Sequence, residues 1–357
     1  MLLSVDLETN DPAHDFLSAP LPLPPLPLES GLTSAPGFPG AYALQYAYLP
    51  VVRKPRVWTV FVALAVAFIA GLVVGGMVPV MMVVAENGGK FENPQALTEA
   101  IQTGILQPTI LLSSGAATQA MLLVTALSAA ILSPVRLVRR LRLNPSTLSP
   151  IGYIIAPIGA LAVSVLFSNI VTLLGIHESG TIKLMGDAFK KLTHTELVFA
   201  VLIVGVAPGF AEEFLFRGYM QTRLVQRWGR WPAIWITAAG FGIMHMDPLQ
   251  SPFAFAFGIY LGYLAEKSGS IRPTMLCHAV NNGLMVVLGW MAGSAASEPT
   301  RKQAAVIAVV ATVVLVLCCL YVRYRVHPPQ TIDEPPPPDG GIFIPSPILP
   351  GPSMATA

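Results

Sequence analysis

The stretch VWTVFVALAVAFIAGLVVGGMVPVMMVVA, residues 57–85, decides the class of fold. It carries no charged side chain. Coiled as an α-helix, it is longer than the roughly 30 Å of hydrocarbon in a bilayer. An uninterrupted apolar run of this length is typical of a transmembrane helix. We therefore expect the chain to cross a membrane here.

Apolar runs recur along the rest of the chain, so we expect an all-α, polytopic transmembrane bundle with about eight spans. Hydrophobic residues make up 54% of the sequence and charged residues 11%, against about 25% charged residues in soluble domains. This composition argues against a soluble enzyme. The further expected spans are Thr109–Leu132, Ile151–Ile176, Leu197 to about Leu224, Trp231 to about Pro248, Phe253–Ala265, Pro273–Ala292 and Ala304–Tyr321.

The net charge of +2 gives no basic surface that would favour a nucleic-acid partner. The three cysteines, Cys277, Cys318 and Cys319, lie in apolar stretches and form no CxxC pair. A disulfide framework and a structural zinc finger are therefore excluded in practice. The glycine pairs Gly71/Gly75 and Gly258/Gly262 match a small-xxx-small spacing, which we interpret as helix packing rather than a dimer interface.

Basic side chains are concentrated in alternate connections between the expected spans. Connections rich in Lys and Arg face the cytoplasm, so we expect an integral, multi-pass membrane protein with both termini in the cytoplasm. The side chains on which this depends are Arg53, Lys54, Arg56, Arg136, Arg139, Arg140, Arg142, Arg223, Arg227, Arg230, Lys267, Arg272, Arg323 and Arg325.

Ionisable and amide side chains are concentrated in the spans of one third of the chain. Such residues are costly in a bilayer and indicate function by default. A single one could simply be structural, but the group on one side of the membrane points to a functional cavity. Gln119 and Asn169, in other spans, are expected to form interhelical hydrogen bonds. The members of the group are Glu212, Glu213, Arg217, His245, Asp247, His278, Asn281 and Asn282.

Helical spacing separates the roles of the two glutamates. Glu213 and Arg217 are four residues apart, with the acid first, which favours an ion pair. Glu212 points about 100° away and is left out of that pair, which suits a general base. Glu212 and His245 are equidistant in sequence from the turn at Trp228–Gly229, so they are expected at the same height.

The remaining motif residues also pair by helical spacing. His278 and Asn282 are four residues apart, as are Phe241 and His245. Each pair is expected to share a helix face. A glutamate with two histidines can activate water, with or without a metal ion.

Sequence signatures of other hydrolases are missing. There is no HExxH and no GxSxG, which argues against a soluble-type zinc protease and a serine hydrolase. The Gly186-Asp187 dipeptide falls in a predicted loop, which argues against an intramembrane aspartyl protease.

The three motifs Glu212-Glu213-x-x-x-Arg217, Phe241-x-x-x-His245 and His278-x-x-x-Asn282 resemble those of the CPBP family. This family comprises the type II CAAX prenyl endopeptidases and bacteriocin-processing intramembrane proteases, also called Abi proteins. The resemblance covers about residues 195–290. It implies hydrolysis of a peptide bond in a membrane-associated peptide or protein, which could be prenylated and CAAX-type or bacteriocin-like.

The resemblance also implies roles for residues. Glu212 matches the glutamate that activates water, His245 and His278 match catalytic or metal-binding histidines, and Asn282 matches the residue that stabilises the oxyanion. Glu213, Arg217 and Phe241 would support them. A divalent metal ion, with zinc favoured, would bind His245 and His278, although a carboxylate would have to complete a three-ligand set. Activation of water by Glu212 and His245 without a metal is the alternative.

We expect the protein in a bacterial-type plasma membrane rather than in the endoplasmic reticulum. The sequence also divides into segments with different expected roles. The proline-rich ends include Pro20–Pro27 and Pro335–Pro338, which favour polyproline II and are expected to be disordered. The segments are a cytoplasmic tail at 1–52, accessory transmembrane helices at 53–195, a CPBP-type catalytic core at 196–292, a last transmembrane helix at 293–326 and a second tail at 327–357.

Two other functions remain open from the sequence. A non-catalytic membrane scaffold or immunity protein could bind a partner through the helices and tails. A proton-coupled transporter could use the buried Glu and His as a relay, but its inverted repeats would place similar polar residues in both halves. Neither the substrate nor the oligomeric state can be predicted from these residues.

Overall fold

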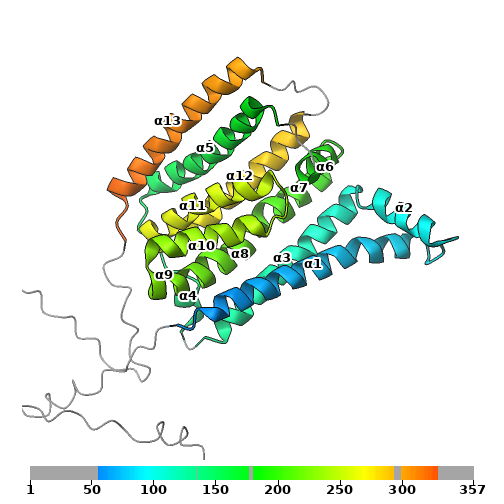
Figure 1. The fold of residues 1–357 in the computed structure, drawn as a ribbon, viewed down its shortest axis with the longest axis horizontal. Coiled ribbons are helices and arrows are strands. Elements are labelled where there is room, and N and C mark those ends of the chain that lie inside the picture. The colour runs from blue at the N-terminus through cyan, green and yellow to red at the C-terminus, as the bar shows by residue number, and fades with distance from the viewer. Residues whose placement is uncertain (1–54, 134, 177–179, 293–298, 329–357) are drawn as a thin grey trace, which may run out of the picture. The chain divides into compact units, whose positions relative to one another are not determined.

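The computed structural model describes residues 55–133, 135–176, 180–292 and 299–328 (Figure 1). Every regular element in these ranges is a helix, which confirms the predicted all-α polytopic bundle. The predicted tails at 1–52 and 327–357 fall almost entirely outside the described residues, so their disorder and the division into segments stay predictions.

The helix carrying the two glutamates is continuous from residue 194 to 228, but it changes its winding. It comprises α7 (His194–Ala200), the π-helical η3 (Val201–Val206), α8 (Ala207–Glu213), the π-helical η4 (Phe214–Gln221) and α9 (Thr222–Trp228). The other helices are α1 (Trp58–Glu86), α2 (Pro94–Gly104), α3 (Pro108–Ile131), α4 (Leu137–Arg140), α5 (Pro150–Leu174), α6 (Gly180–Phe189), α10 (Arg230–Ile243), α11 (Gln250–Ser268), α12 (Arg272–Ala292) and α13 (Arg301–Arg325).

Local sequence signals explain where these helices begin and end. Ser149 caps α5 by accepting from the Gly152 amide, and Pro150 occupies the first turn, where no amide donor is needed. Thr193 begins the long helix with a reciprocal capping box to Glu196. Gly175 and Gly269 adopt positive φ values of 68° and 66° directly after α5 and α11, a conformation that glycine adopts at little cost.

Six helical stretches in the described residues are long and apolar enough to cross a membrane. They are Trp58–Glu86, Pro108–Ile131, Pro150–Leu174, His194–Trp228, Arg272–Ala292 and Arg301–Arg325. These stretches support an integral membrane protein.

Of the about eight predicted spans, those at α10 and α11 do not meet this measure of length and hydropathy in the described residues. α10 has only 14 residues, because the chain turns at Met246, whose φ is +49°, and Pro248 follows. α11 has 19 residues but is less apolar, and it carries Glu266 and Lys267 in its last turn. The two form an antiparallel hairpin (Figure 1), with Trp231 of α10 stacked on Tyr263 of α11 at 6.0 Å.

The predicted helix-packing role of the glycine pairs is confirmed. A side chain at Gly71 or Gly75 of α1 would meet Thr118 of α3, and one at Gly258 of α11 would meet Ala238 of α10 at 3.1 Å. Asn169 departs from its prediction: it donates to the Val165 carbonyl of its own helix at 2.8 Å instead of bridging helices.

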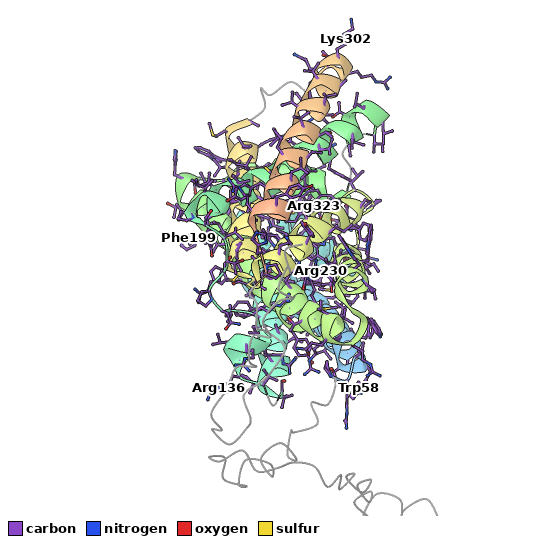
Figure 2. The ribbon with its side chains drawn as sticks, turned by 90° about the vertical axis from the view of Figure 1, so that its left-hand side faces the viewer. Trp58, Arg136, Phe199, Arg230, Lys302 and Arg323 are labelled. Carbon is purple, nitrogen blue, oxygen red and sulfur yellow. The ribbon has the colours of Figure 1, made fainter. Side chains whose placement is uncertain are left out.

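The Arg-rich connections gather at one end of the helices. Arg142 pairs with Glu266, Arg223 donates to Thr59 at 2.9 Å, and Lys267 donates to the Arg323 carbonyl at 2.9 Å. Figure 2 places Trp58 and Arg136 at this end and Lys302 at the other. α10 and α11 form a hairpin, so the chain returns to the same end whether or not the two helices cross the membrane. The gathering of the arginines at one end therefore does not depend on counting them as spans.

We predict that this Arg-rich end is cytoplasmic. Cysteines introduced as Trp228→Cys and Met185→Cys, in a variant whose own cysteines are replaced, should react with a membrane-impermeant thiol reagent from opposite sides of the membrane. The measurement is labelling in intact cells against opened vesicles. Labelling of both positions from the same side would contradict the topology.

Candidate active site

The two glutamates lie between the two π-helical segments, η3 and η4. A π-helical turn rotates the residues that follow it, and such turns are frequent at functional sites. Pro208, near the start of α8, has no amide hydrogen. The amide of Ala207, just before it, donates to the Leu202 carbonyl five residues earlier, as in a π-helix.

Glu213 and Arg217 form the predicted ion pair. Nη1 of Arg217 donates to Oε1 of Glu213 at 2.7 Å, and both side chains have no exposed surface. The guanidinium also donates to the Gly258 carbonyl at 3.4 Å and lies 4.4 Å from the centre of the Phe241 ring. Glu213 is thus held as a structural anion inside the bundle.

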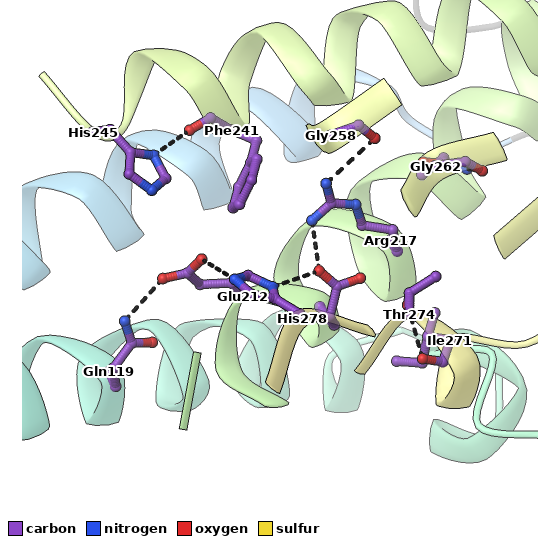
Figure 3. Close-up of polar contacts among 12 residues, drawn as sticks. Gln119, Glu212, Arg217, Phe241, His245, Gly258, Gly262, Ile271, Thr274 and His278 are labelled. Carbon is purple, nitrogen blue, oxygen red and sulfur yellow. Dashed lines mark hydrogen bonds and ion pairs between the residues drawn. The ribbon is translucent and has the colours of Figure 1, made fainter. Parts of the chain in front are cut away.

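His278 joins this pair from α12. Its Nδ1 lies 3.0 Å from Oε1 of Glu213 and donates to it, while its Nε2 lies 3.7 Å from Oε2 of Glu212 (Figure 3). A hydrogen bond at one ring nitrogen fixes the orientation and tautomer of an imidazole. Glu213 therefore directs the Nε2 atom of His278 toward Glu212.

Glu212 is separate from the Glu213–Arg217 pair, as its spacing predicts. Its Oε1 accepts a hydrogen bond from Nε2 of Gln119 at 2.8 Å, which confirms the interhelical bond predicted for Gln119. Its side chain remains 12% exposed, whereas that of Glu213 has no exposed surface. Oε2 of Glu212 is thus left facing His278.

His245 lies just beyond the end of α10, in the turn that precedes α11. Its Nδ1 donates to the Phe241 carbonyl at 2.9 Å, and its ring lies against the Phe241 ring at 5.1 Å. The shared face of the two residues is confirmed. Figure 3 shows the His245 ring on the side of Glu212 opposite Gln119, with its Nε2 end toward the carboxylate.

Asn282 of α12 donates to a backbone carbonyl of the helix that carries the two glutamates. Its Nδ2 donates to the Val204 carbonyl, in the π-helical segment η3, at 3.3 Å. Asn281 beside it donates to Oδ1 of Asn282 at 3.1 Å. No hydrogen bond joins Asn282 to Glu212 or His278 in the described residues, so its predicted place at the reacting centre is not tested.

Gly205 and Gly209, which the sequence analysis did not identify, allow α12 to approach the helix that carries the two glutamates. A Cβ at Gly205 would lie 2.8 Å from Cα of Gly283, and one at Gly209 would lie 2.9 Å from the Met275 carbonyl. Such close approaches of two helices need a small residue at the contact. The signal was available, because Gly205 and Gly209 have the same small-xxx-small spacing as the pairs that were identified.

The donors fit a metal ion poorly. Neutral Nε2 atoms of His245 and His278 are suitable zinc ligands, but a catalytic zinc site uses three protein ligands. In the described ranges, no group of three or more His, Cys, Asp or Glu side chains is placed to hold a metal ion. Glu213 is committed to Arg217 and His278. The zinc ion therefore stays a prediction from sequence.

Comparison with known proteins identifies one family. Residues 194–284 match the family of type II CAAX prenyl endopeptidase Rce1-like proteins. Neither the curated proteins nor the solved structures include a match to the chain. The matched residues run from the start of α7 into α12 and include all three motifs, so residues 194–284 form an Rce1-like region, as the resemblance to the CPBP family predicts.

Proposed function

We propose that this protein is an intramembrane endopeptidase in which Glu212 activates a water molecule for attack on a peptide bond. The Rce1-like region implies peptidase activity and suggests a CAAX-type intramembrane protease. The roles of individual residues and the nature of the substrate belong to the proposal.

The proposal rests on the different surroundings of the two glutamates. Oε1 of Glu213 is bound by both a cation and an imidazole, and the side chain has no exposed surface, so water cannot reach it. Glu212 is bound at one oxygen by a neutral amide, and its other oxygen lies 3.7 Å from Nε2 of His278 (Figure 3). A carboxylate with one oxygen positioned and the other available has the geometry of a general base.

The proposed reaction consumes only one water molecule for each peptide bond that is broken. Oε2 of Glu212 takes one proton from water as the water oxygen bonds to the carbonyl carbon. The carbon–nitrogen bond then breaks, the proton passes to the departing amine, and a carboxyl and an amine are released. The Nε2 atoms of His245 and His278 would orient the water and the carbonyl oxygen, and Glu213 would hold His278 in place.

Asn282 is proposed to stabilise the oxyanion, as the resemblance implies. An amide nitrogen has two hydrogens, and only one is used in the bond to Val204. The second would have to reach the carbonyl oxygen beside His278. Losing one oxyanion donor costs roughly 10² to 10³ in turnover.

A cleavage assay in proteoliposomes tests the function. Wild type and Glu212→Ala would be reconstituted side by side with a farnesylated CAAX peptide, and with the same peptide lacking the farnesyl group. The proposal expects Glu212-dependent release of a C-terminal fragment. Cleavage of the farnesylated peptide alone would identify the substrates as prenylated CAAX peptides. Equal cleavage of both peptides would show that the enzyme does not recognise the prenyl group.

Metal removal gives a separate prediction. Because the donors do not complete a three-ligand set, we expect a protein stripped of metal by a strong chelator to retain its turnover, with metal content measured by elemental analysis. Loss of turnover, restored by one equivalent of zinc, would instead support the zinc site that the sequence predicts at His245 and His278.

A further inference from the structure

A chain of hydrogen bonds runs from α5 to the Asn282 side chain of α12. Oγ of Ser164 donates to Oδ1 of Asn281 at 2.5 Å. Nδ2 of Asn281 donates to Oδ1 of Asn282 at 3.1 Å, and Nδ2 of Asn282 donates to the Val204 carbonyl at 3.3 Å. The chain therefore joins α5, α12 and the helix that carries the two glutamates.

The two inner members of this chain are buried. Ser164 is 8% exposed and Asn281 is 1% exposed, where α5 lies against α12 (Figure 1). Asn282 is only partly buried. Buried polar groups have to find their hydrogen-bond partners within the protein, so Ser164 and Asn281 hold each other in place. Ser164 also lies outside the Rce1-like region, which begins at residue 194.

The Val204 carbonyl sets the direction of every bond in the chain. A backbone carbonyl can only accept, so the Asn282 side chain has to present its NH₂ group to it. Oδ1 of Asn282 then faces Asn281, which has to present its own NH₂ group. This leaves Oδ1 of Asn281 for the Ser164 hydroxyl, which donates. Turning over either amide, or both, would bring two acceptors together.

We propose that Ser164 and Asn281 are positioning residues, which keep the Asn282 amide turned with its nitrogen toward the helix of the glutamates. This inference rests on the proposed function, in which the second hydrogen of Nδ2 stabilises the oxyanion. With the amide turned over, an oxygen would take the place of that donor and repel the developing negative charge. A donor that is held in place before the reaction stabilises the transition state without having to be reoriented during it.

The test is a double-mutant cycle on the full-length protein, with Ser164→Ala, Asn282→Ala and the two changes combined. In proteoliposomes, kcat and KM would be measured with the farnesylated CAAX peptide, and the unfolding temperature would be measured without substrate. Ser164→Thr keeps the hydroxyl group. Ser168→Ala is the matched control, because Ser168 is an exposed serine one turn further along α5 and lies outside the chain.

We expect Ser164→Ala to lower kcat about tenfold at unchanged KM, in line with the loss of one hydrogen bond. Ser164→Thr and Ser168→Ala should keep the kcat of the wild type. In the Asn282→Ala background, Ser164→Ala should cause no further loss of kcat, because the amide that it positions is gone. The loss of unfolding temperature in the combined variant should likewise be smaller than the sum of the single losses.

Three results would overturn the positioning role and leave the proposed peptidase intact, provided that cleavage is abolished in Glu212→Gln. The first is a wild-type kcat in Ser164→Ala. The second is the same fractional loss of kcat with and without the Asn282 side chain, which would mean that the hydroxyl acts through packing. The third is additive losses of unfolding temperature, which would mean that no chain links the two residues. Cleavage that persists in Glu212→Gln would contradict the proposed function itself, and this inference with it.

Discussion

Replacing Glu212 by glutamine is expected to lower turnover by about 10²-fold or more, because the amide keeps the shape of the side chain but cannot accept a proton. Gln119 can still bond to the new side chain through its carbonyl oxygen, so the fold should be preserved. The measurement is kcat for any cleaved substrate, together with the unfolding temperature. Unchanged kcat would exclude Glu212 as the base.

The neighbouring glutamate provides the matched control. Glu213→Gln removes the charge that binds both Arg217 and His278 and leaves an uncompensated buried cation. Breaking a buried pair in this way costs about 3–5 kcal/mol of stability. We therefore expect this variant to unfold at a markedly lower temperature, whereas Glu212→Gln should not. Equal stability and equal loss of turnover in the two variants would contradict the separate roles.

Gly209→Ala is expected to reduce turnover by about 10²-fold, although it adds one carbon atom. The new Cβ would lie 2.9 Å from the Met275 carbonyl and 3.1 Å from the Ala279 amide nitrogen, so α12 has to move away. Since α12 carries His278, the Nε2 atom of that residue would move relative to Glu212. A displacement of about 1 Å at a catalytic group can cost this much.

Gly76→Ala controls for the change in helix propensity. Gly76 lies in α1, and nothing comes within 4 Å of a Cβ placed there. Alanine favours a helix over glycine by about 1 kcal/mol, so this variant should keep full turnover. Full turnover in Gly209→Ala as well would show that the close approach of α12 does not position His278.

The sequence predicts most of the site because the pairing rules involved are local. Glu213 and Arg217 meet by helical spacing alone, and so do Phe241 and His245. Spacing could not reveal that Glu213 also binds His278, because that contact depends on how closely α12 approaches α8. The glycines that permit this approach are visible in the sequence, but their partner helix is not.

Other details could not be predicted from the sequence, because they depend on which helices lie side by side or on the local winding of a helix. Gln119 was expected to bond across helices, yet nothing in the sequence identified Glu212 as its acceptor. Asn169 instead donates a hydrogen bond to a carbonyl of its own helix. The π-helical turns have no reliable sequence signature, and the bond from Asn282 to the Val204 carbonyl depends on where α12 lies. α10 is shorter than its apolar run because the backbone turns at Met246.

The most direct test of a Glu212-dependent intramembrane peptidase is a search for new protein termini in native membranes. Membranes containing wild type or Glu212→Gln would be incubated in water enriched in ¹⁸O, and new C-termini identified by mass spectrometry. Glu212-activated hydrolysis predicts C-termini that carry ¹⁸O in the wild-type membranes and are absent with Glu212→Gln. The same set of termini in both membranes, or none in either, would contradict it.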